Sequence, residues 1–494
     1  MKGAETISLP AARLEEAARE LMASGGRMQM VYACTAEDGE PELRYLASPP
    51  RPGPFLIWRC RPGADPPSLA PIWPLLGWYE REIMDLFGLR FRNHPEPEPL
   101  VLPPNVPPPF TRSGQGRSSS AEPAAVEAPR SLPAIAPGDV QILPFGPVRA
   151  GVVESAEFTF FYLGERIIHY QPHLFFKHRG MEQRFEGADP QQGVILAERV
   201  SGVGTVAHAL AFCQAVEAAS DCTVPERARW LRALLAELER VYNHLHYHGH
   251  LSATTTLKVG ETQGKLLEER VKQINARLTG SRFLRSLLIP GGLRRDLAPI
   301  GWLATELETL RSEAARYTDM LERSDSHLDR LITTGPLSAQ VAFDQGATGP
   351  IQRASGADRD LRRDHPYAAY GDLPFRAEVR HEGDAYARYA LRTAELDASI
   401  ALLQRILLLL PEGPVRVPSL PQPGAEGLGW SESPRGSLFY AVHFGAGGRL
   451  CRVKIKSPSF SNWRIFPSTV HETNMMDYAI NEASFGLTVA GCAR

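Results

Sequence analysis

The chain has 494 residues, of which 43% are hydrophobic, and its formal net charge is -2. This length predicts roughly two to four domains with full apolar cores, and the near-neutral charge gives no reason to expect nucleic acid as a partner. The six cysteines include no Cys-x-x-Cys pair, which excludes a disulfide framework and argues against an iron–sulfur cluster held by this chain alone.

No segment predicts direct insertion into a membrane. Residues 1–10 lack a basic stretch followed by an apolar one, so we expect no secretory signal. The most apolar run, 400–411, is interrupted by Gln404 and Arg405 and is too short to span a bilayer. We therefore expect a cytoplasmic polypeptide that reaches a membrane only through partners.

The first 96 residues predict a small α/β domain. Apolar residues recur at helical spacing over 11–22. Short β-rich runs follow at 27–35, 42–47 and 55–60.

Three carboxylates lie near the end of this domain, on a helix that a glycine should break. Glu80, Glu82 and Asp85 precede Gly88, after which the chain extends into Pro95. On pattern alone, these carboxylates indicate a solvated acidic helix.

Residues 97–143 predict a linker, because fourteen of the 42 prolines lie between 95 and 147 and apolar residues are sparse there. Residues 144–494 predict a mainly helical domain with minor β structure, which begins with a hairpin of 158–163 and 167–171. Its long helices are expected at 191–218, 226–250, 262–278, 301–332 and 380–410. The fold class is therefore α+β.

Four histidines alternate at the end of the second long helix: His244, His246, His248 and His250. His244 and His248 share a helix face, so a two-histidine zinc site is geometrically possible. However, Arg240 stands where a third ligand would be needed, and Gly249 should end the helix. We interpret the histidines as surface or capping groups and predict no metal site.

The acidic segment belongs to a longer motif, Trp78-Tyr-Glu-Arg-Glu82-Ile-Met-Asp85-Leu-Phe-Gly88-Leu-Arg-Phe91-Arg-Asn-His94-Pro95. This string resembles the motif of the 30 kDa-type subunit of respiratory complex I. That domain is also fused in front of the large subunit in formate-hydrogenlyase-type hydrogenases.

Further blocks resemble the superfamily of complex I 49 kDa subunits and group 4 nickel–iron hydrogenase large subunits. They include His178-Arg-Gly-Met-Glu182, Pro290-Gly-Gly-Leu-Arg-Arg-Asp296, Gly349-Pro-Ile-Gln-Arg353, Asp360-Leu-Arg-Arg-Asp364 and Lys456-Ser-Pro458. The resemblance implies that 144–494 forms a hydrogenase-large-subunit-like domain.

The four metal-binding cysteines of such hydrogenases are missing. Ser201 and Gly204 stand at the first pair of positions, and Thr488 and Gly491 stand at the second pair. A nickel–iron site needs thiolates, which hydroxyl groups and hydrogen atoms cannot replace. We expect no nickel–iron centre and no cofactor bound by this chain alone.

The quinone contacts of complex I are also absent. The resemblance places a quinone-binding histidine in a Gly-Pro-Gln-His-Pro segment, where this chain has Gly146-Pro147-Val148-Arg149-Ala150, and a tyrosine near Ser201-Gly202. An apolar pocket with few polar anchors could still accept a quinone.

Polar residues of the matched blocks are the candidate lining of the vacated cavity: Glu154, His178, Arg179, Glu182, Arg199, Arg353 and Asp360, with His208 and Arg363 beside them. They could relay protons or hold a charge that drives a membrane subunit. Structural ion pairs, and a packed core position for His208, are the alternative.

Two functions stay open. The chain would be a peripheral-arm subunit of a complex-I-like membrane complex, which couples electron transfer to a quinone-like acceptor with ion translocation. Alternatively, it would be a redox-silent scaffold or coupling subunit. Both imply an iron–sulfur small subunit with its clusters, membrane-arm subunits, and a peripheral place on the cytoplasmic side of the inner membrane.

Overall fold

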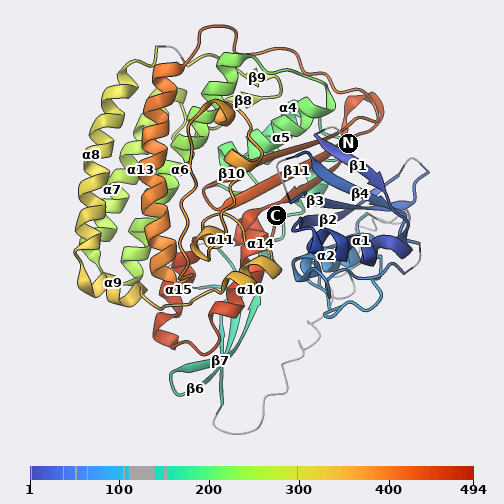
Figure 1. Ribbon diagram of the computed structural model, residues 1–494, viewed down its shortest axis with the longest axis horizontal. Coiled ribbons are helices and arrows are strands. Elements are labelled where there is room, and N and C mark those ends of the chain that lie inside the picture. The colour runs from blue at the N-terminus through green and yellow to red at the C-terminus, as the bar shows by residue number, and fades with distance from the viewer. Residues whose placement is uncertain are drawn as a thin grey trace.

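The computed structural model describes all residues except 2, 37, 51–52, 64, 104–105, 111–139, 150–153 and 298. It confirms an α+β fold (Figure 1). A sheet with two helices forms the N-terminal side of the molecule, long helices form the opposite side, and a second sheet lies between them. Most of the predicted linker 97–143 lies outside the described residues, and the strand β5 begins at Gln141.

The N-terminal unit is built on a four-stranded sheet in the order β1-β4-β3-β2. Its elements are β1 (Ala4–Ser8), α1 (Leu14–Ala23), β2 (Arg27–Thr35), β3 (Pro41–Ser48), β4 (Phe55–Cys60) and α2 (Gly77–Phe87). β1 runs parallel to β4, and the other pairs are antiparallel. The predicted helix and the three predicted strands are confirmed, whereas the sequence pattern does not predict β1.

The expectation that α2 is a solvated acidic helix is wrong. Glu80 is 0% exposed, and it accepts hydrogen bonds from Ser68 Oγ at 2.5 Å and from the backbone N–H of Leu69 at 2.8 Å. Asp85 accepts three backbone N–H groups from residues 100–102. These carboxylates fix the loops around α2. Gly88 ends the helix in the left-handed conformation, as expected.

The remaining chain contains mostly helices. Its elements are β5 (Gln141–Phe145), β6 (Glu157–Leu163), β7 (Arg166–His173), α3 (Met181–Arg184), α4 (Pro190–Ala197), α5 (Thr205–Ala219), α6 (Glu226–Thr254), α7 (Lys258–Thr279), β8 (Leu288–Ile289), β9 (Gly292–Leu293), α8 (Trp302–Glu322), α9 (Asp325–Leu331), α10 (Ala339–Asp344), α11 (Pro350–Ala354), α12 (Leu361–Asp364), α13 (Ala385–Leu409), β10 (Glu426–Ser433), β11 (Gly436–Phe444), β12 (Leu450–Lys456), α14 (Pro458–Ile465), α15 (Tyr478–Phe485) and α16 (Val489–Cys492). The predicted hairpin is confirmed as β6 and β7.

Two of the predicted long helices are interrupted. The helix expected at 191–218 is divided into α4 and α5, because residues 198–204 leave helical geometry around two glycines. The helix expected at 301–332 is divided into α8 and α9. The interruption before α5 is the segment that resembles the metal-binding motif.

Gly249 lies inside α6 and does not end it, so that expectation is wrong. A Cβ atom built on Gly264 of α7 would lie 2.7 Å from the Cα of Gly249. The two glycines therefore let α6 and α7 approach closely, and α6 continues to Thr254. With α8 and α13 these helices make up the bundle opposite the N-terminal unit (Figure 1).

The sheet of β10, β11 and β12 joins the two sides of the molecule. One face of β10 packs on α5, where a Cβ on Gly429 would lie 2.1 Å from the carbonyl oxygen of Ala211. On the other side, Phe55 of β4 lies 5.2 Å from the ring of Phe439 on β11. Buried apolar residues form one continuous core from Leu14 to Cys492. The two sides are thus packed as one body.

Candidate functional site

The two segments that lack the metal ligands lie against each other. Arg179 connects them: its guanidinium donates to the carbonyl oxygens of Arg199 at 2.9 Å and Val200 at 2.6 Å, and to that of Ala490 at 3.0 Å. Ser201 follows directly and is 6% exposed. Hydrogen bonds from one arginine therefore join the segments that thiolate-bound metal would join.

The C-terminal segment is capped from two directions. The Glu154 carboxylate accepts hydrogen bonds from the backbone N–H of Val489 at 2.5 Å and of Ala490 at 3.1 Å. Thr488 is the N-cap of α16 and accepts from the Gly491 N–H at 3.2 Å. A Cβ on Gly491 would lie 2.6 Å from Thr488 Oγ1, so this position has no room for a cysteine unless Thr488 moves.

The backbone N–H groups at the start of α5 are also hydrogen-bonded to a carboxylate. Glu239 of α6 accepts from the backbone N–H of Val206 at 2.6 Å and of Ala207 at 3.0 Å, and burial raises the pKa of this carboxyl to about 7. His208 is buried against Tyr440, with Nδ1 2.8 Å from the phenol oxygen. Burial, aided by Arg179 and Arg494, lowers the pKa of His208 to about 3. His208 is neutral and packed.

The donor set does not fit a nickel–iron centre. The four matched positions offer two hydroxyl groups and two glycine hydrogens, and the soft thiolate ligands are absent. Among the described residues, no group of three or more His, Cys, Asp or Glu side chains has the arrangement of a metal site. The interpretation of the four histidines as surface or capping groups is wrong for His244 and His248, which are buried inside α6. His244 Nε2 contacts Glu395 at 2.9 Å, and burial places the pKa of His248 well below its usual range.

Glu182 belongs to a second cluster, which lies at the contact between the N-terminal unit and the rest of the chain. Its carboxylate contacts Lys454 at 3.0 Å, Arg452 at 2.9 Å and Arg494 at 3.2 Å. Arg494 also contacts Glu82 of α2 at 2.7 Å, and Lys454 pairs with the same carboxylate. Burial favours the neutral form of Glu182, yet the facing cations hold the pKa of this carboxyl below its usual range.

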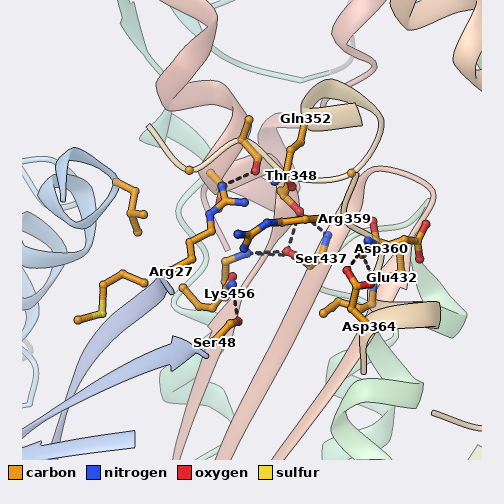
Figure 2. A pocket seen from close by; sticks show the side chains of 18 of the residues that line it. Arg27, Ser48, Thr348, Gln352, Arg359, Asp360, Asp364, Glu432, Ser437 and Lys456 are labelled. Carbon is orange, nitrogen blue, oxygen red and sulfur yellow. Dashed lines mark hydrogen bonds between the residues drawn. The ribbon is translucent and has the colours of Figure 1, made fainter. Parts of the chain in front are cut away.

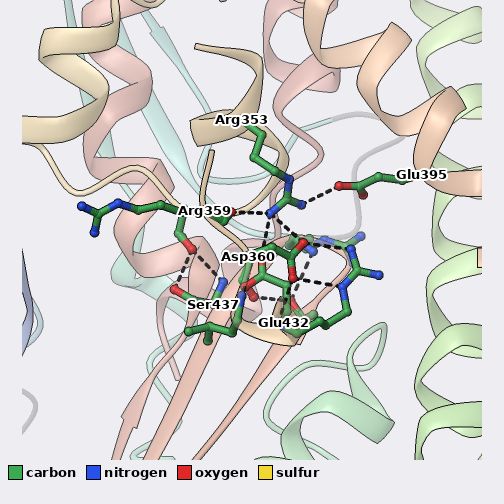
Figure 3. Close-up of polar contacts among 12 residues, drawn as sticks. Arg353, Arg359, Asp360, Glu395, Glu432 and Ser437 are labelled. Carbon is green, nitrogen blue, oxygen red and sulfur yellow. Dashed lines mark hydrogen bonds and ion pairs between the residues drawn. The ribbon is translucent and has the colours of Figure 1, made fainter. Parts of the chain in front are cut away.

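Arg353 and Asp360 lie in a third cluster, shown in Figure 3. The Arg353 guanidinium contacts Asp360 and Glu432 at 3.1 Å each, and it also pairs with Glu395. Asp360 contacts Arg362 at 2.9 Å. Burial and the neighbouring Asp360 raise the pKa of Glu432 to about 7, so this carboxyl can exchange a proton near neutral pH.

The third cluster forms one wall of a cavity of about 340 Å³ (Figure 2). Asp360 and Glu432 line it from the helical side, and Arg27 and Ser48 line it from the N-terminal sheet. Lys456, at the end of β12, lies between them, and burial lowers its pKa to about 7.

The structure thus places the predicted site residues in separate groups. Glu154, His178 and Arg179 contact the C-terminal segment, with His178 Nδ1 3.2 Å from the carbonyl oxygen of Ala493. Glu182 and the Arg353–Asp360 pair lie in the two ion clusters described above. The Arg199 side chain is 50% exposed and donates to the carbonyl oxygen of Ile195 at 2.9 Å, whereas its backbone carbonyl accepts from Arg179.

Four charged residues of these clusters escape sequence reasoning: Glu395, Glu432, Lys454 and Arg494. They lie far along the chain from their partners, and no local spacing marks them. Arg149, which stands near the position of the quinone-binding histidine, is buried and pairs with Glu482 at 3.0 Å.

Two segments that match metal-binding segments of hydrogenase large subunits are thus held together by hydrogen bonds, with the ligand positions occupied by other residues. Family models match as follows: the 49 kDa subunit of respiratory-chain NADH dehydrogenase at 266–423 and 418–494, its 30 kDa subunit at 7–118, and nickel-dependent hydrogenase at 179–263. The chain belongs to the family of complex I 49 kDa subunits and hydrogenase large subunits, joined to a 30 kDa-type domain. The resemblance seen in the sequence is confirmed.

Individual relatives support the same assignment. Formate hydrogenlyase subunit 5 of Escherichia coli (strain K12) is 32% identical over 405 residues, which cover 80% of this chain and 71% of that protein. A subunit of NADH-quinone oxidoreductase from Koribacter versatilis (strain Ellin345) is 30% identical over 367 residues, which cover 67% of this chain and 90% of that protein.

Among solved structures, a chain of the membrane-bound sulfane sulfur reductase, an archaeal respiratory membrane complex, superposes with a TM-score of 0.68. It is 27% identical and covers 72% of this chain and 99% of its own length. In the described part of the present chain, no helix has the length and apolar character required to cross a membrane.

Proposed function

We propose that this chain is a peripheral-arm subunit of a complex-I-like membrane complex and works without a nickel–iron centre. In this role it couples electron transfer to a quinone-like acceptor with ion translocation. An iron–sulfur small subunit would supply the electrons from its clusters, and membrane-arm subunits would move the ion. The protein would lie on the cytoplasmic side of the membrane. The family assignment and the respiratory complexes among its relatives support this proposal.

The observation that carries the proposal is the position of Arg179. Its three hydrogen bonds keep the fold of a metal-binding region without the metal, so the surfaces around it can be retained for partners. Arg179 is only partly buried. An acceptor would therefore contact the Arg179 guanidinium at the edge of the vacated metal region. It would not enter that region, which the hydrogen-bonded segments fill.

Buried charge clusters provide groups that could respond to electron transfer. Glu239 and Glu432 have pKa values of about 7, so a nearby change in charge would shift their protonation. Glu154, His178 and Glu182 contact the C-terminal segment or its last residue. Arg353 pairs with both Asp360 and Glu432, and the charge of Asp360 helps to raise the pKa of Glu432. Arg199 contributes its backbone carbonyl. We propose these residues as positioning groups around the acceptor edge and the proton-labile carboxyls.

A redox-silent coupling protein is the second candidate. The hydrogen bonds in the vacated metal region favour this candidate. Glu154, Thr488 and Glu239 accept from the backbone N–H groups that would otherwise face a bound group. In that case electrons would not leave through this chain, and the ion clusters would only transmit conformational change.

The purified membrane complex separates the two candidates. Its partner clusters would be reduced with dithionite, and their reoxidation by a short-chain quinone would be followed by absorbance and electron paramagnetic resonance. We expect reoxidation in the wild type, loss of it in Arg179→Ala, and retention in Arg199→Ala, the matched arginine control on the segment that Arg179 contacts.

Clusters that stay reduced in the wild type, in a complex that still translocates ions with its own donor, would support the redox-silent role. Stoichiometric nickel in the purified complex would contradict both candidates. Equal loss of reoxidation in Arg179→Ala and Arg199→Ala would show that Arg179 has no specific role in electron transfer.

A further inference from the structure

The cavity between the N-terminal sheet and the helical domain is lined by three cations that form no ion pair with any carboxylate of the described residues. Arg27, Arg359 and Lys456 converge on it from the start of β2, the loop before α12 and the end of β12 (Figure 2). Burial lowers the pKa of both Arg27 and Lys456. The three cations are also close enough to repel one another, because Arg359 lowers the pKa of Arg27 further and Arg27 lowers that of Lys456.

The contacts of these cations are all neutral. Arg27 is 4% exposed and donates to the carbonyl oxygen of Ala347 at 2.7 Å. Lys456 is 3% exposed and donates to Ser437, at 2.9 Å to the hydroxyl and 3.4 Å to the carbonyl oxygen. Within the described residues, neither of them nor Arg359 has a carboxylate at ion-pair distance. Buried cations without a counterion are costly, so a missing anion is indicated.

The carboxylates of the same cavity differ from these cations, because each of them is already paired with an arginine. Asp360 pairs with Arg353 and Arg362, Glu432 pairs with Arg353, and Asp364 pairs with Arg363 at 2.8 Å. These acids are held by arginines outside the cavity. Glu432 and Asp364 favour the charged forms of Lys456 and Arg359 from beyond ion-pair distance, so among the described residues the cationic wall is left without an ion pair of its own.

A further donor is available on the same side. Gln352 of α11 lines the cavity, and its Nε2 is buried without a hydrogen-bond partner. An amide N–H, a guanidinium fork and an ammonium group are the donors that bind carboxylate or phosphate oxygens. The volume of about 340 Å³ is within the range of small-molecule sites.

We propose that this interdomain cavity is a binding site for a small oxyanion, a carboxylate or phosphate group on a compact molecule. Arg27 and Arg359 would hold two oxygens, and Lys456 and Gln352 would hold the remaining ones. Because Arg27 comes from the N-terminal unit and the other three come from the helical domain, the ligand would link the two. None of the four vacated ligand positions lines this cavity, and the test of this site does not depend on electron transfer.

The test is a binding titration of the full-length chain in a buffer without oxyanions. Inorganic phosphate and succinate would be added in separate arms at millimolar concentrations, with calorimetry and the unfolding temperature as readouts. We expect saturable binding and a higher unfolding temperature in at least one arm. The arm that binds more tightly identifies phosphate or dicarboxylate as the preferred source of the oxyanion.

Two variants locate the site. Lys456→Met and Arg27→Met should each weaken binding about tenfold or more, whereas Arg311→Met, an exposed arginine paired with Asp397 on the far side of the bundle, should not. Without ligand and at about pH 6, where Lys456 with its pKa of about 7 is mostly protonated, Lys456→Met should unfold at a higher temperature than the wild type, because it removes a buried unpaired cation.

Three results would overturn the proposal: no binding of either anion to the wild type, binding that is unchanged in both variants, or a ligand-free Lys456→Met that is less stable than the wild type. If one variant fails to fold, the other variant and the wild-type titration still show whether the cavity binds an oxyanion.

Discussion

Replacement of Arg353 by methionine would remove the central cation of a buried ion cluster. Arg353 is 0% exposed, and its guanidinium serves Asp360, Glu395 and Glu432 together. Removal of one partner from a buried ion pair costs about 3–5 kcal/mol. Because three carboxylates lose a shared partner, we expect Arg353→Met to lower the free energy of unfolding by about 5 kcal/mol.

Glu432 makes this loss dependent on pH. Its pKa is raised to about 7 by burial first and Asp360 second, and Arg353 opposes that rise. Without Arg353 the pKa rises further. A carboxyl with a raised pKa in the folded state contributes stability that is fully present below its unfolded pKa and is lost as pH rises through the folded pKa. Arg353→Met should therefore be less destabilised at about pH 6 than at about pH 8.

Urea denaturation of the full-length chain, followed by circular dichroism, measures both effects. Arg363→Met is the matched control: its side chain is 33% exposed and pairs with Asp358 at 2.6 Å and Asp364 at 2.8 Å. An exposed pair contributes about 1 kcal/mol or less. Equal losses in the two variants, or a loss below about 1 kcal/mol in Arg353→Met, would refute the assignment of Arg353 as the cluster's organising cation.

Three further changes probe the vacated metal position. Glu154→Gln weakens the acceptor at the start of α16, so amide hydrogen exchange there should speed up about tenfold; unchanged exchange would contradict the capping role. Gly491→Ala should cost about 1–3 kcal/mol in urea denaturation, and the double variant with Thr488→Ala should lose less than the sum of the two single variants. His208→Gln removes a histidine with a pKa of about 3. As pH falls below about 6.5, the wild type should lose up to about 1.4 kcal/mol per pH unit relative to this variant, and parallel pH profiles would argue against it.

Much of the fold could be predicted from the sequence, because the determining patterns are local. Period-two and helical spacings gave three strands of the N-terminal sheet, the β6–β7 hairpin and the positions of most long helices. The matched blocks also gave the family, and with it the expectation that Ser201 and Thr488 belong to one region. Arg179 contacts Val200, which precedes Ser201, and Ala490, two residues beyond Thr488.

The charge partners could not be predicted, because they depend on long-range packing. Glu82 appears solvated from its neighbours in sequence, but its cations are Lys454 and Arg494, 372 and 412 residues away. Likewise, Glu182 and Arg353 lie on matched blocks yet belong to different clusters. Only the tertiary arrangement separates them.

The hydrogen bonds of Arg179 join the two segments of the vacated metal site, so the polypeptide holds them together without a metal ion. A metal held by thiolates from two segments would couple local folding to the supply of that ion. Here hydrogen bonds join residues that are 311 positions apart, and they form without any delivered component. We therefore expect the cellular abundance of the folded chain to be independent of nickel availability, so that the protein could be assembled wherever the metal is scarce.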